Sequence, residues 1–294
     1  MGLNHPKTSQ AGRLRERLNQ PGIIAMPGAF NAITAKLIEK TGFEGVYVTG
    51  AGLINGMTGY PDIGLLSATE ITQFAGYIDD AVEIPVICDA DTGYGEALQV
   101  MRTVQLFEQA GVAGIHLEDQ VSPKRCGHLD GKQLVSIEDM QTKIRAACKA
   151  RQNPDFLIIG RVDARGVSGM EDAITRAKAY VAAGADMIFP EAMQSEEEFA
   201  RFAKAVDIPL LANMTEFGKS PYLSAQDFDA LGYKIVIFPM TAFRVMMHAV
   251  QEALTELKNT GSQAGFLDRM QTRQALYALL EYDAYNELDR QCSE

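Results

Sequence analysis

The sequence has no tryptophan and few cysteines, four among 294 residues. Cys88, Cys126, Cys148 and Cys292 do not occur at paired spacings, which argues against a disulfide framework and against a structural zinc site. We therefore expect free thiols. Burial is the expected role of Cys88, in an apolar run, and of Cys148, in a helical segment.

Long apolar runs and an excess of positive charge are also absent. No stretch of about 18 apolar residues occurs, and the segment from Met1 to Gln20 is polar, without the apolar core of a signal peptide. The 27 basic and 38 acidic side chains give a net charge of −11, which disfavours nucleic acid and anionic membranes as partners. We expect a cytoplasmic globular protein. A small anionic ligand is compatible with this charge, because a few arginines can set the field inside a cleft.

Eight short apolar runs alternate with segments of helical pattern, which indicates repeated strand–helix units around a parallel sheet. Several runs are apolar without alternation, as in strands covered on both faces. The runs are Gly22–Met26, Gly45–Thr49, Ile84–Asp89, Val112–Glu118, Phe156–Asp163, Asp186–Glu191, Ile208–Asn213 and Lys234–Pro239. This count predicts a single α/β domain (1–294) with a (β/α)8 TIM-like barrel over about 20–258. A doubly wound open sheet is the alternative.

Helices are predicted between these runs, at Ala97–Gln109, Ile137–Ala150, Met170–Ala183 and Ser195–Val206. Ser136 and Ser195 each precede acidic residues, as a capping serine does at the start of a helix. The last run is followed by a helix over Phe243–Lys258 and then by a surplus helical region, Gln263–Leu288. We predict that this extension (259–294) docks on a neighbouring subunit; folding back on its own barrel is the alternative.

Polar side chains stand where most of the predicted strands end, which in a barrel is the face that carries the active site. Asp89, Asp91 and Glu118 are hard oxygen ligands at two adjacent strand ends, and they predict a Mg²⁺ site with Mn²⁺ as a possible substitute. A helix N-cap is the alternative for Asp91 alone. Arg161, inside an apolar strand, must pair with either a structural carboxylate or a substrate carboxylate. His116 is predicted to be a buried core histidine.

Residues 123–128 read Pro-Lys-Arg-Cys-Gly-His. Lys124, Arg125 and His128 place Cys126 in positive potential, which predicts a lowered pKa of the thiol and a role as proton carrier or nucleophile. A solvated basic loop with an inert thiol is the alternative. The segment Ser122–Gly131 is predicted to act as a lid over substrate, with an ordinary fixed loop as the other interpretation.

This motif follows His-Leu-Glu-Asp-Gln, with Asp-Ala-Asp upstream and Asn-Met-Thr-Glu-Phe-Gly downstream. Together, over about Pro27 to Leu288, these residues resemble the isocitrate lyase and phosphoenolpyruvate mutase superfamily, and Lys-Arg-Cys-Gly-His is typical of its carbon–carbon lyases. The resemblance implies a C-terminal helix exchanged between subunits and a homotetramer built of dimers. It also implies Mg²⁺-dependent cleavage of a tricarboxylate, (2S,3R)-2-methylisocitrate, to pyruvate and succinate, in the methylcitrate cycle of propionate breakdown.

The resemblance also assigns residues. Asp89 and Asp91 match metal positions, with Glu118 close by. Thr49, Gly50 and Ala51 match a loop that contacts the pyruvate part, where the family more often has Ser-Gly-Gly. The other substrate-contacting positions are matched by Cys126, Gly127, Arg161, Glu191, Asn213, Thr215, Arg244 and Arg273. Val162 stands where the family more often has threonine, so one hydroxyl is missing there.

For the retro-aldol reaction, Cys126 is the predicted general acid, and His128 and Glu191 set its proton supply. Lys124 and Arg125 would stabilise negative charge nearby. Either Tyr47 or Arg161 would assist deprotonation of the substrate hydroxyl, and this choice stays open.

Related substrates are the competing hypotheses: 2,3-dimethylmalate, oxaloacetate and isocitrate. Phe189, Ile237 and Pro239 lie near strand ends and could enclose a methyl group, but one methylene changes binding by only about 1–3 kcal/mol. A hypothesis of another class is an inactive barrel that binds a dicarboxylate. It predicts that metal or thiol residues are lost, whereas all of them are present.

Overall fold

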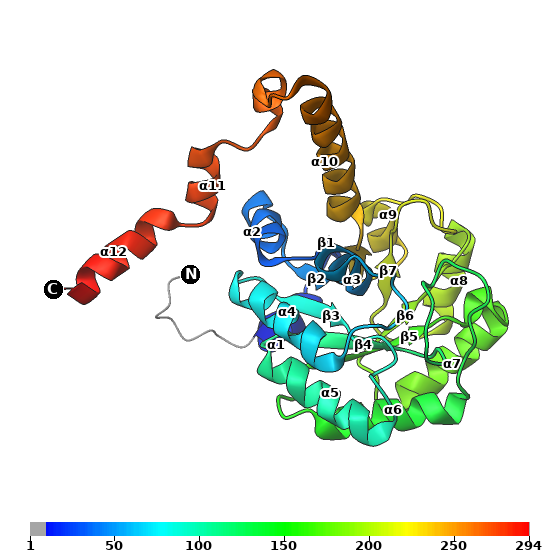
Figure 1. The fold of residues 1–294 in the computed structure, drawn as a ribbon. Helices are drawn as coiled ribbons and strands as arrows, with labels where there is room; N and C mark the ends of the chain where they lie inside the picture. Colours follow the sequence, from blue (N-terminus) through cyan, green and yellow to red (C-terminus); the bar gives the residue numbers. More distant parts are fainter. Residues whose placement is uncertain (1–9, 294) are drawn as a thin grey trace.

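Eight parallel strands form a barrel with helices packed around it in the computed structural model, which describes residues 10–293 (Figure 1). The first nine residues of the polar N-terminal segment, and Glu294, lie outside the described residues. The strands are β1 (Ile24–Ala29), β2 (Val46–Val48), β3 (Val86–Asp89), β4 (Gly114–Glu118), β5 (Leu157–Val162), β6 (Met187–Pro190), β7 (Leu211–Asn213) and β8 (Ile235–Phe238). The two ends of each strand lie within three residues of the ends of its predicted run.

The strand order is β6-β5-β4-β3-β2-β1-β8-β7. Strand β1 pairs in parallel with both β2 and β8, which joins the first strand to the last. Between β6 and β7 the ladder is reduced to a single bridge of Ile188 and Leu210, with the Ile188 N–H donating to the Pro209 carbonyl at 3.1 Å. This order confirms the barrel and excludes the doubly wound sheet.

The helices are α1 (Gln10–Leu18), α2 (Ala32–Thr41), α3 (Gly50–Thr58), α4 (Ala68–Asp80), α5 (Ala97–Gln109), α6 (Ile137–Ala150), α7 (Met170–Ala182), α8 (Glu196–Ala205), α9 (Ala225–Ala230), α10 (Thr241–Thr260), α11 (Arg273–Leu279) and α12 (Tyr282–Ser293), with short 3₁₀ turns at Ala164–Gly166 and Ala264–Arg269. Helices α5 and α6 have the predicted bounds. The hydroxyl oxygens of Ser136 and Ser195 accept the expected capping hydrogen bonds, from the backbone of Asp139 (3.0 Å) and Glu198 (3.3 Å).

Two apolar layers hold the barrel together. The larger one lies between the outer faces of the strands and the surrounding helices. The smaller one fills the barrel interior and includes Met26, Ile87 and Ile159. Leu14 of α1 belongs to this inner layer and is fully buried, so α1 covers the end of the barrel where the strands begin. The other end, where the strands finish, is left for the site.

The C-terminal part leaves the barrel. Helix α10 projects from it, the chain then turns back toward α2 through α11, and α12 leads away from the barrel (Figure 1). No residue of α10 is buried, and the apolar side chains of Val245, Val250 and Leu254 are exposed. The predicted helical region Gln263–Leu288 is divided into a 3₁₀ turn, α11 and α12, and it meets the barrel near α2, where Lys36 pairs with Glu281 at 3.2 Å. Docking on a second subunit stays a prediction. Among residues 10–293, no helix combines the length and the apolar character needed to cross a bilayer.

Candidate active site

A cavity at the carboxyl ends of the strands brings most of the predicted residues together. It is lined by Tyr47, Thr49, Ala51, Asp62, Asp89, Lys124, Cys126, Gly127, His128, Arg161, Phe189, Glu191, Asn213, Thr215, Ile237, Pro239 and Met240. Arg244 and Arg273 are not among them. Asp62, in the segment between α3 and α4, was missed by sequence reasoning because it follows no strand.

Buried carboxylates form one side of the site. The Asp91 backbone, in the left-handed region at φ 46°, donates its N–H to Asp89 Oδ1 at 2.9 Å. Lys124 Nζ lies 2.9 Å from Asp91 Oδ1 and also pairs with Asp62. Glu118 is 1% exposed, and neither of its carboxylate oxygens has a hydrogen-bond partner among residues 10–293.

These carboxylates suit a hard divalent cation. Burial raises the pKa of Asp91 to about 6; Lys124 opposes this shift, while Asp89 and Asp62 add to it. Burial also raises the pKa of Asp89, and that of Glu118 well above its usual range. Crowded anionic oxygens of this kind fit Mg²⁺. Within the described part of the chain no three His, Cys, Asp or Glu side chains are arranged as a ready metal site, so the ligand set remains a prediction.

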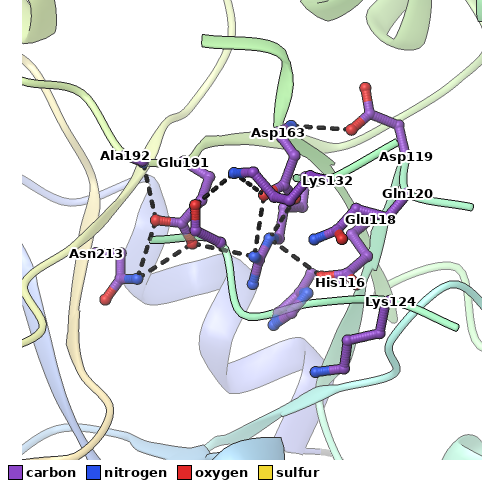
Figure 2. A network of polar contacts seen from close by, with 12 residues as sticks. His116, Glu118, Asp119, Gln120, Lys124, Lys132, Asp163, Glu191, Ala192 and Asn213 are labelled. Atoms are coloured by element: carbon purple, nitrogen blue, oxygen red, sulfur yellow. Dashed lines mark hydrogen bonds and ion pairs between the residues drawn. The ribbon is translucent and has the colours of Figure 1, made fainter. Parts of the chain in front are cut away.

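Arg161 is paired with carboxylates of its own chain. Its Nε lies 2.9 Å from Asp163 Oδ2 and 3.3 Å from Glu118 Oε2, and its Nη2 lies 3.3 Å from Glu191 Oε2. Burial alone would lower the pKa of the guanidinium, but these carboxylates outweigh it and hold the pKa well above its usual value. Figure 2 shows this network around Glu118, Asp163 and Glu191. Pairing with carboxylates of its own chain is found, and contact of Arg161 with a substrate stays a prediction.

The cations around Cys126 do not act on the thiol as predicted. Lys124 is neutralised by Asp62 and Asp91, and Arg125 is exposed to solvent. Burial raises the pKa of Cys126, and Glu191 adds to this, against a lowering by the His128 backbone N–H. The expectation of a lowered pKa was therefore wrong. The thiol keeps its proton at neutral pH, as an acid must.

The loop carrying Cys126 lies against the carboxylates of the barrel. His128 Nε2 is 2.9 Å from Glu191 Oε1, while its Nδ1 accepts the Lys219 backbone N–H at 2.9 Å. A Cβ on Gly127 would lie 2.5 Å from Arg161 Nη2 and still closer to the Glu191 side chain, so only glycine fits here. Burial of Lys124 and Gly127 does not fit a fully solvated loop, and the role of the thiol stays a prediction.

Tyr47 and His116 form a buried pair beneath the cavity. The Tyr47 hydroxyl lies 2.9 Å from His116 Nε2, and the two rings stack. Burial lowers the pKa of His116 to about 3, so the ring is neutral, and it raises that of Tyr47 well above 10. His116 is buried as predicted, although its Nδ1 has no hydrogen-bond partner within the part of the chain described.

The positions expected to form a pyruvate-binding loop begin a helix instead. Thr49 is the N-cap of α3, and its hydroxyl oxygen accepts the Gly52 N–H at 3.2 Å. A Cβ on Gly50 would lie 2.6 Å from Asp89 Oδ2, so the helix start packs directly on this carboxylate. Backbone N–H groups at a helix start suit an anionic ligand.

The remaining predicted residues divide into two groups. Asn213 is buried in the site, and its Nδ2 donates to Glu191 Oε2 at 3.2 Å. Arg244 lies on exposed α10, 3.7 Å from Glu216, and its guanidinium lies over the Phe217 ring. Arg273 is exposed at the start of α11. Neither arginine is brought into the cavity within one chain, so their roles stay predictions.

Comparisons with known proteins show the family to which the chain is similar. The family model described as phosphoenolpyruvate phosphomutase matches residues 14–258. A probable 2-methylisocitrate lyase of Corynebacterium glutamicum is 51% identical over 284 residues, covering 97% of this chain and 92% of that protein. A 2-methylisocitrate lyase of Aeropyrum pernix is 51% identical over 280 residues, covering 95% and 90%.

Solved structures of related enzymes have the same fold as this chain. A crystal structure of 2,3-dimethylmalate lyase, described as a member of the PEP mutase/isocitrate lyase superfamily, superposes with a TM-score of 0.92 at 37% identity, covering 98% of this chain and 96% of that one. Phosphonopyruvate hydrolase in complex with oxalate and Mg²⁺ superposes with a TM-score of 0.88 at 30% identity, covering 98% and 100%.

Proposed function

The chain belongs to the phosphoenolpyruvate phosphomutase family, and from this premise we propose that it cleaves (2S,3R)-2-methylisocitrate to pyruvate and succinate by a Mg²⁺-dependent retro-aldol reaction. It is a carbon–carbon lyase, like the 2-methylisocitrate lyases to which it is similar. Such a reaction serves the methylcitrate cycle of propionate breakdown.

The placement of Cys126 carries the proposal. When a buried carboxylate of the site takes the proton of the substrate hydroxyl, a C=O bond forms in pyruvate, and the C–C bond breaks with its electron pair left on the succinate fragment. That carbanion needs a proton at once. The Cys126 thiol, protonated because burial raises its pKa, lines the same cavity as Asp89 and can supply it. His128 and Glu191, 2.9 Å apart beside it, would restore the proton.

Tyr47 and Arg161 act on the substrate hydroxyl as hydrogen-bond donors in this scheme. Both keep their protons, since the pKa of each lies well above its usual value. They therefore stabilise the oxyanion that develops on the substrate and do not take its proton. Lys124 lines the same cavity, where it is paired with Asp62 and Asp91.

Asp89 and Asp91, with Glu118 beside them, are the residues that would hold Mg²⁺. When bound there, the ion supplies Lewis-acid stabilisation of negative charge. The solved phosphonopyruvate hydrolase complex with oxalate and Mg²⁺ supports this choice of metal. The start of α3 at Thr49, Gly50 and Ala51 would receive the pyruvate carboxylate.

A neighbouring subunit would complete the site. Arg273 is exposed and outside the cavity of its own chain, so we propose that it contacts substrate only across a subunit interface, with Arg244 near that boundary. The assembly we propose is a homotetramer built of dimers. Its cytoplasmic localisation stays a prediction from the sequence.

The second candidate substrate is 2,3-dimethylmalate, because the chain has a structure similar to that of 2,3-dimethylmalate lyase. Phe189, Ile237 and Pro239 line the cavity and would enclose a methyl group in either substrate. Oxaloacetate and isocitrate are the other competitors.

An assay of purified protein tests the proposal. We would incubate it with 2-methylisocitrate, 2,3-dimethylmalate, oxaloacetate or isocitrate, each with Mg²⁺ and with EDTA, and follow the keto-acid and carboxylate products. The expected result is the highest kcat/KM for 2-methylisocitrate and loss of turnover in EDTA. Higher kcat/KM for another substrate would replace the proposed one, and turnover of none would remove the lyase assignment.

A further inference from the structure

Lys132 lies one residue beyond the 122–131 loop and has no role in the chemistry described above. Its side chain is 1% exposed. The ammonium makes two contacts: it donates to the Gly127 carbonyl and lies 2.9 Å from Asp163 Oδ1. A buried lysine that bonds both a loop carbonyl and a barrel carboxylate connects the loop to the barrel. Figure 2 shows Lys132 and Asp163 within the site network.

Asp163 is a fixed anchor. Its carboxylate also accepts hydrogen bonds from Arg161 Nε (2.9 Å) and Nη2 (3.3 Å). Its backbone N–H donates to Asp119 Oδ1 at 2.9 Å, and Asp119 Oδ2 accepts from the Tyr180 hydroxyl at 2.7 Å. Asp163 is therefore held to β4 and α7 through groups that belong to the barrel scaffold. A cation bound to it gains a charge-assisted hydrogen bond in a buried setting.

The Gly127 end of this connection determines where Cys126 sits. Gly127 follows Cys126 directly and lies against Arg161 and Glu191, with no room for a side chain. His128 is held by Glu191 through its side chain, but the backbone between Cys126 and His128 is held by Lys132. The contacts at the Gly127 carbonyl and at the His128 side chain thus hold the loop immediately after Cys126, whereas Lys124 and the Arg125 backbone hold it before Cys126.

We propose that Lys132 is a positioning residue that keeps the Cys126 thiol in the cavity by tying the Gly127 carbonyl to Asp163. The inference depends on the proposed function for the reaction, but the tie itself does not depend on the substrate. The competing interpretation is that Lys132 neutralises the Asp163 charge and has no effect on the loop.

Two variants separate these interpretations. Lys132→Met removes both contacts. Lys132→Arg keeps a cation beside Asp163, but its larger planar group cannot occupy the same buried space below Gly127. Lys149→Met, on the exposed side of α6, is the matched control. Backbone hydrogen exchange of residues 124–131 is measured by mass spectrometry on the free protein, together with kcat, KM and the unfolding temperature.

If Lys132 holds the loop, backbone hydrogen exchange of residues 124–131 should be faster in both Lys132 variants, whereas exchange in β5 should be unchanged. The value of kcat should also fall about 10- to 100-fold, because the acid is misplaced. KM should change by less than about threefold, because substrate contacts remain. If Lys132→Met fails to fold, Lys132→Arg decides.

Loop exchange and kcat equal to those of Lys149→Met in a folded Lys132 variant would overturn the inference, even if the unfolding temperature fell. Exchange needs no substrate, so this outcome is separable from failure of the proposed function, in which the wild-type protein would leave 2-methylisocitrate uncleaved.

Discussion

At the scale of single residues, the environment of Cys126 sets its chemistry more than its sequence neighbours do. Lys124 is paired with Asp62 and Asp91, Arg125 is exposed to solvent, and burial dominates the pKa of the thiol. A thiol of raised pKa is a poor nucleophile and a well-protected proton donor. The structure therefore favours the acid over the nucleophile among the roles considered from the sequence.

Replacing Cys126 by serine should remove the acid with little change in shape. A serine hydroxyl gives up its proton far less readily, so kcat should fall about 10²- to 10⁴-fold, the usual worth of a general acid. Calorimetry should find substrate affinity unchanged. Cys148→Ser, at a half-buried thiol of α6, is the control and should keep full activity. Near wild-type turnover in Cys126→Ser would rule out the acid role.

The pH profile of kcat follows from the same thiol. An acid works only while protonated, and burial raises the pKa of Cys126 above its ordinary value of 9.0. Protonation is therefore complete at neutral pH and is lost only as the pH rises through the raised value. We expect a level profile between pH 7 and about 9, followed by a fall at higher pH. A fall centred near pH 7 would contradict the assigned acid.

The sequence predicted which residues form the site but not all of their partners. Strand-end position found Asp89, Arg161 and Glu191, because strand ends share one face of a barrel. It could not find Asp62 or Lys132, whose positions depend on how loops fold over that face. The predicted direction of the Cys126 pKa was wrong because burial, its largest cause, also depends on how the loop folds, and because Asp62, the partner of Lys124, is 62 residues away.

At the scale of elements, strands and regular helices were predicted well, and helix α3 was not. Buried parallel strands and capped amphipathic helices have strong local patterns. Helix α3 begins Gly-Ala-Gly and contains a third glycine, each unfavourable in a helix by about 1 kcal/mol relative to alanine. Packing of its start on Asp89 outweighs that propensity, and packing cannot be seen in a single sequence.

Helix α10 presents an exposed apolar surface just before the extension predicted to dock on a second subunit, and we expect that subunit to cover α10 as well. Val250→Asp would place a carboxylate within that interface, which is costly without a partner. Light scattering should then show smaller species than the wild-type assembly, with association weakened at least about tenfold, equivalent to about 1.4 kcal/mol.

Asn259→Asp adds the same charge to the polar side of α10, near Glu252 and Glu256, and should leave the assembly intact. A wild-type protein that scatters as a monomer, or a Val250→Asp protein with the wild-type mass, would contradict docking through this helix.

At the scale of the whole molecule, Asp89 and Glu118 lie at the end of the barrel where the strands finish, with Asp91 close by. Binding of Mg²⁺ to the native state should raise the unfolding temperature, since a ligand at 100 times its Kd stabilises by about 2.7 kcal/mol. Asp91→Asn should lose most of this gain, whereas Asp207→Asn, at an exposed carboxylate, should keep it. Differential scanning calorimetry with Mg²⁺ and with EDTA measures both. An equal gain in Asp91→Asn would show that the ion binds elsewhere.

Because only a single bridge joins β6 and β7, the barrel should open first between these two strands. Every other pair of adjacent strands shares a regular ladder, so opening this seam breaks the fewest backbone hydrogen bonds. Transient openings should therefore start between Ile188 and Leu210 and spread outward from there. Glu191 and Asn213 stand on opposite sides of the seam, joined by a hydrogen bond. A ligand that binds in the cavity and contacts both residues should therefore stabilise the barrel where its strand pairing is weakest.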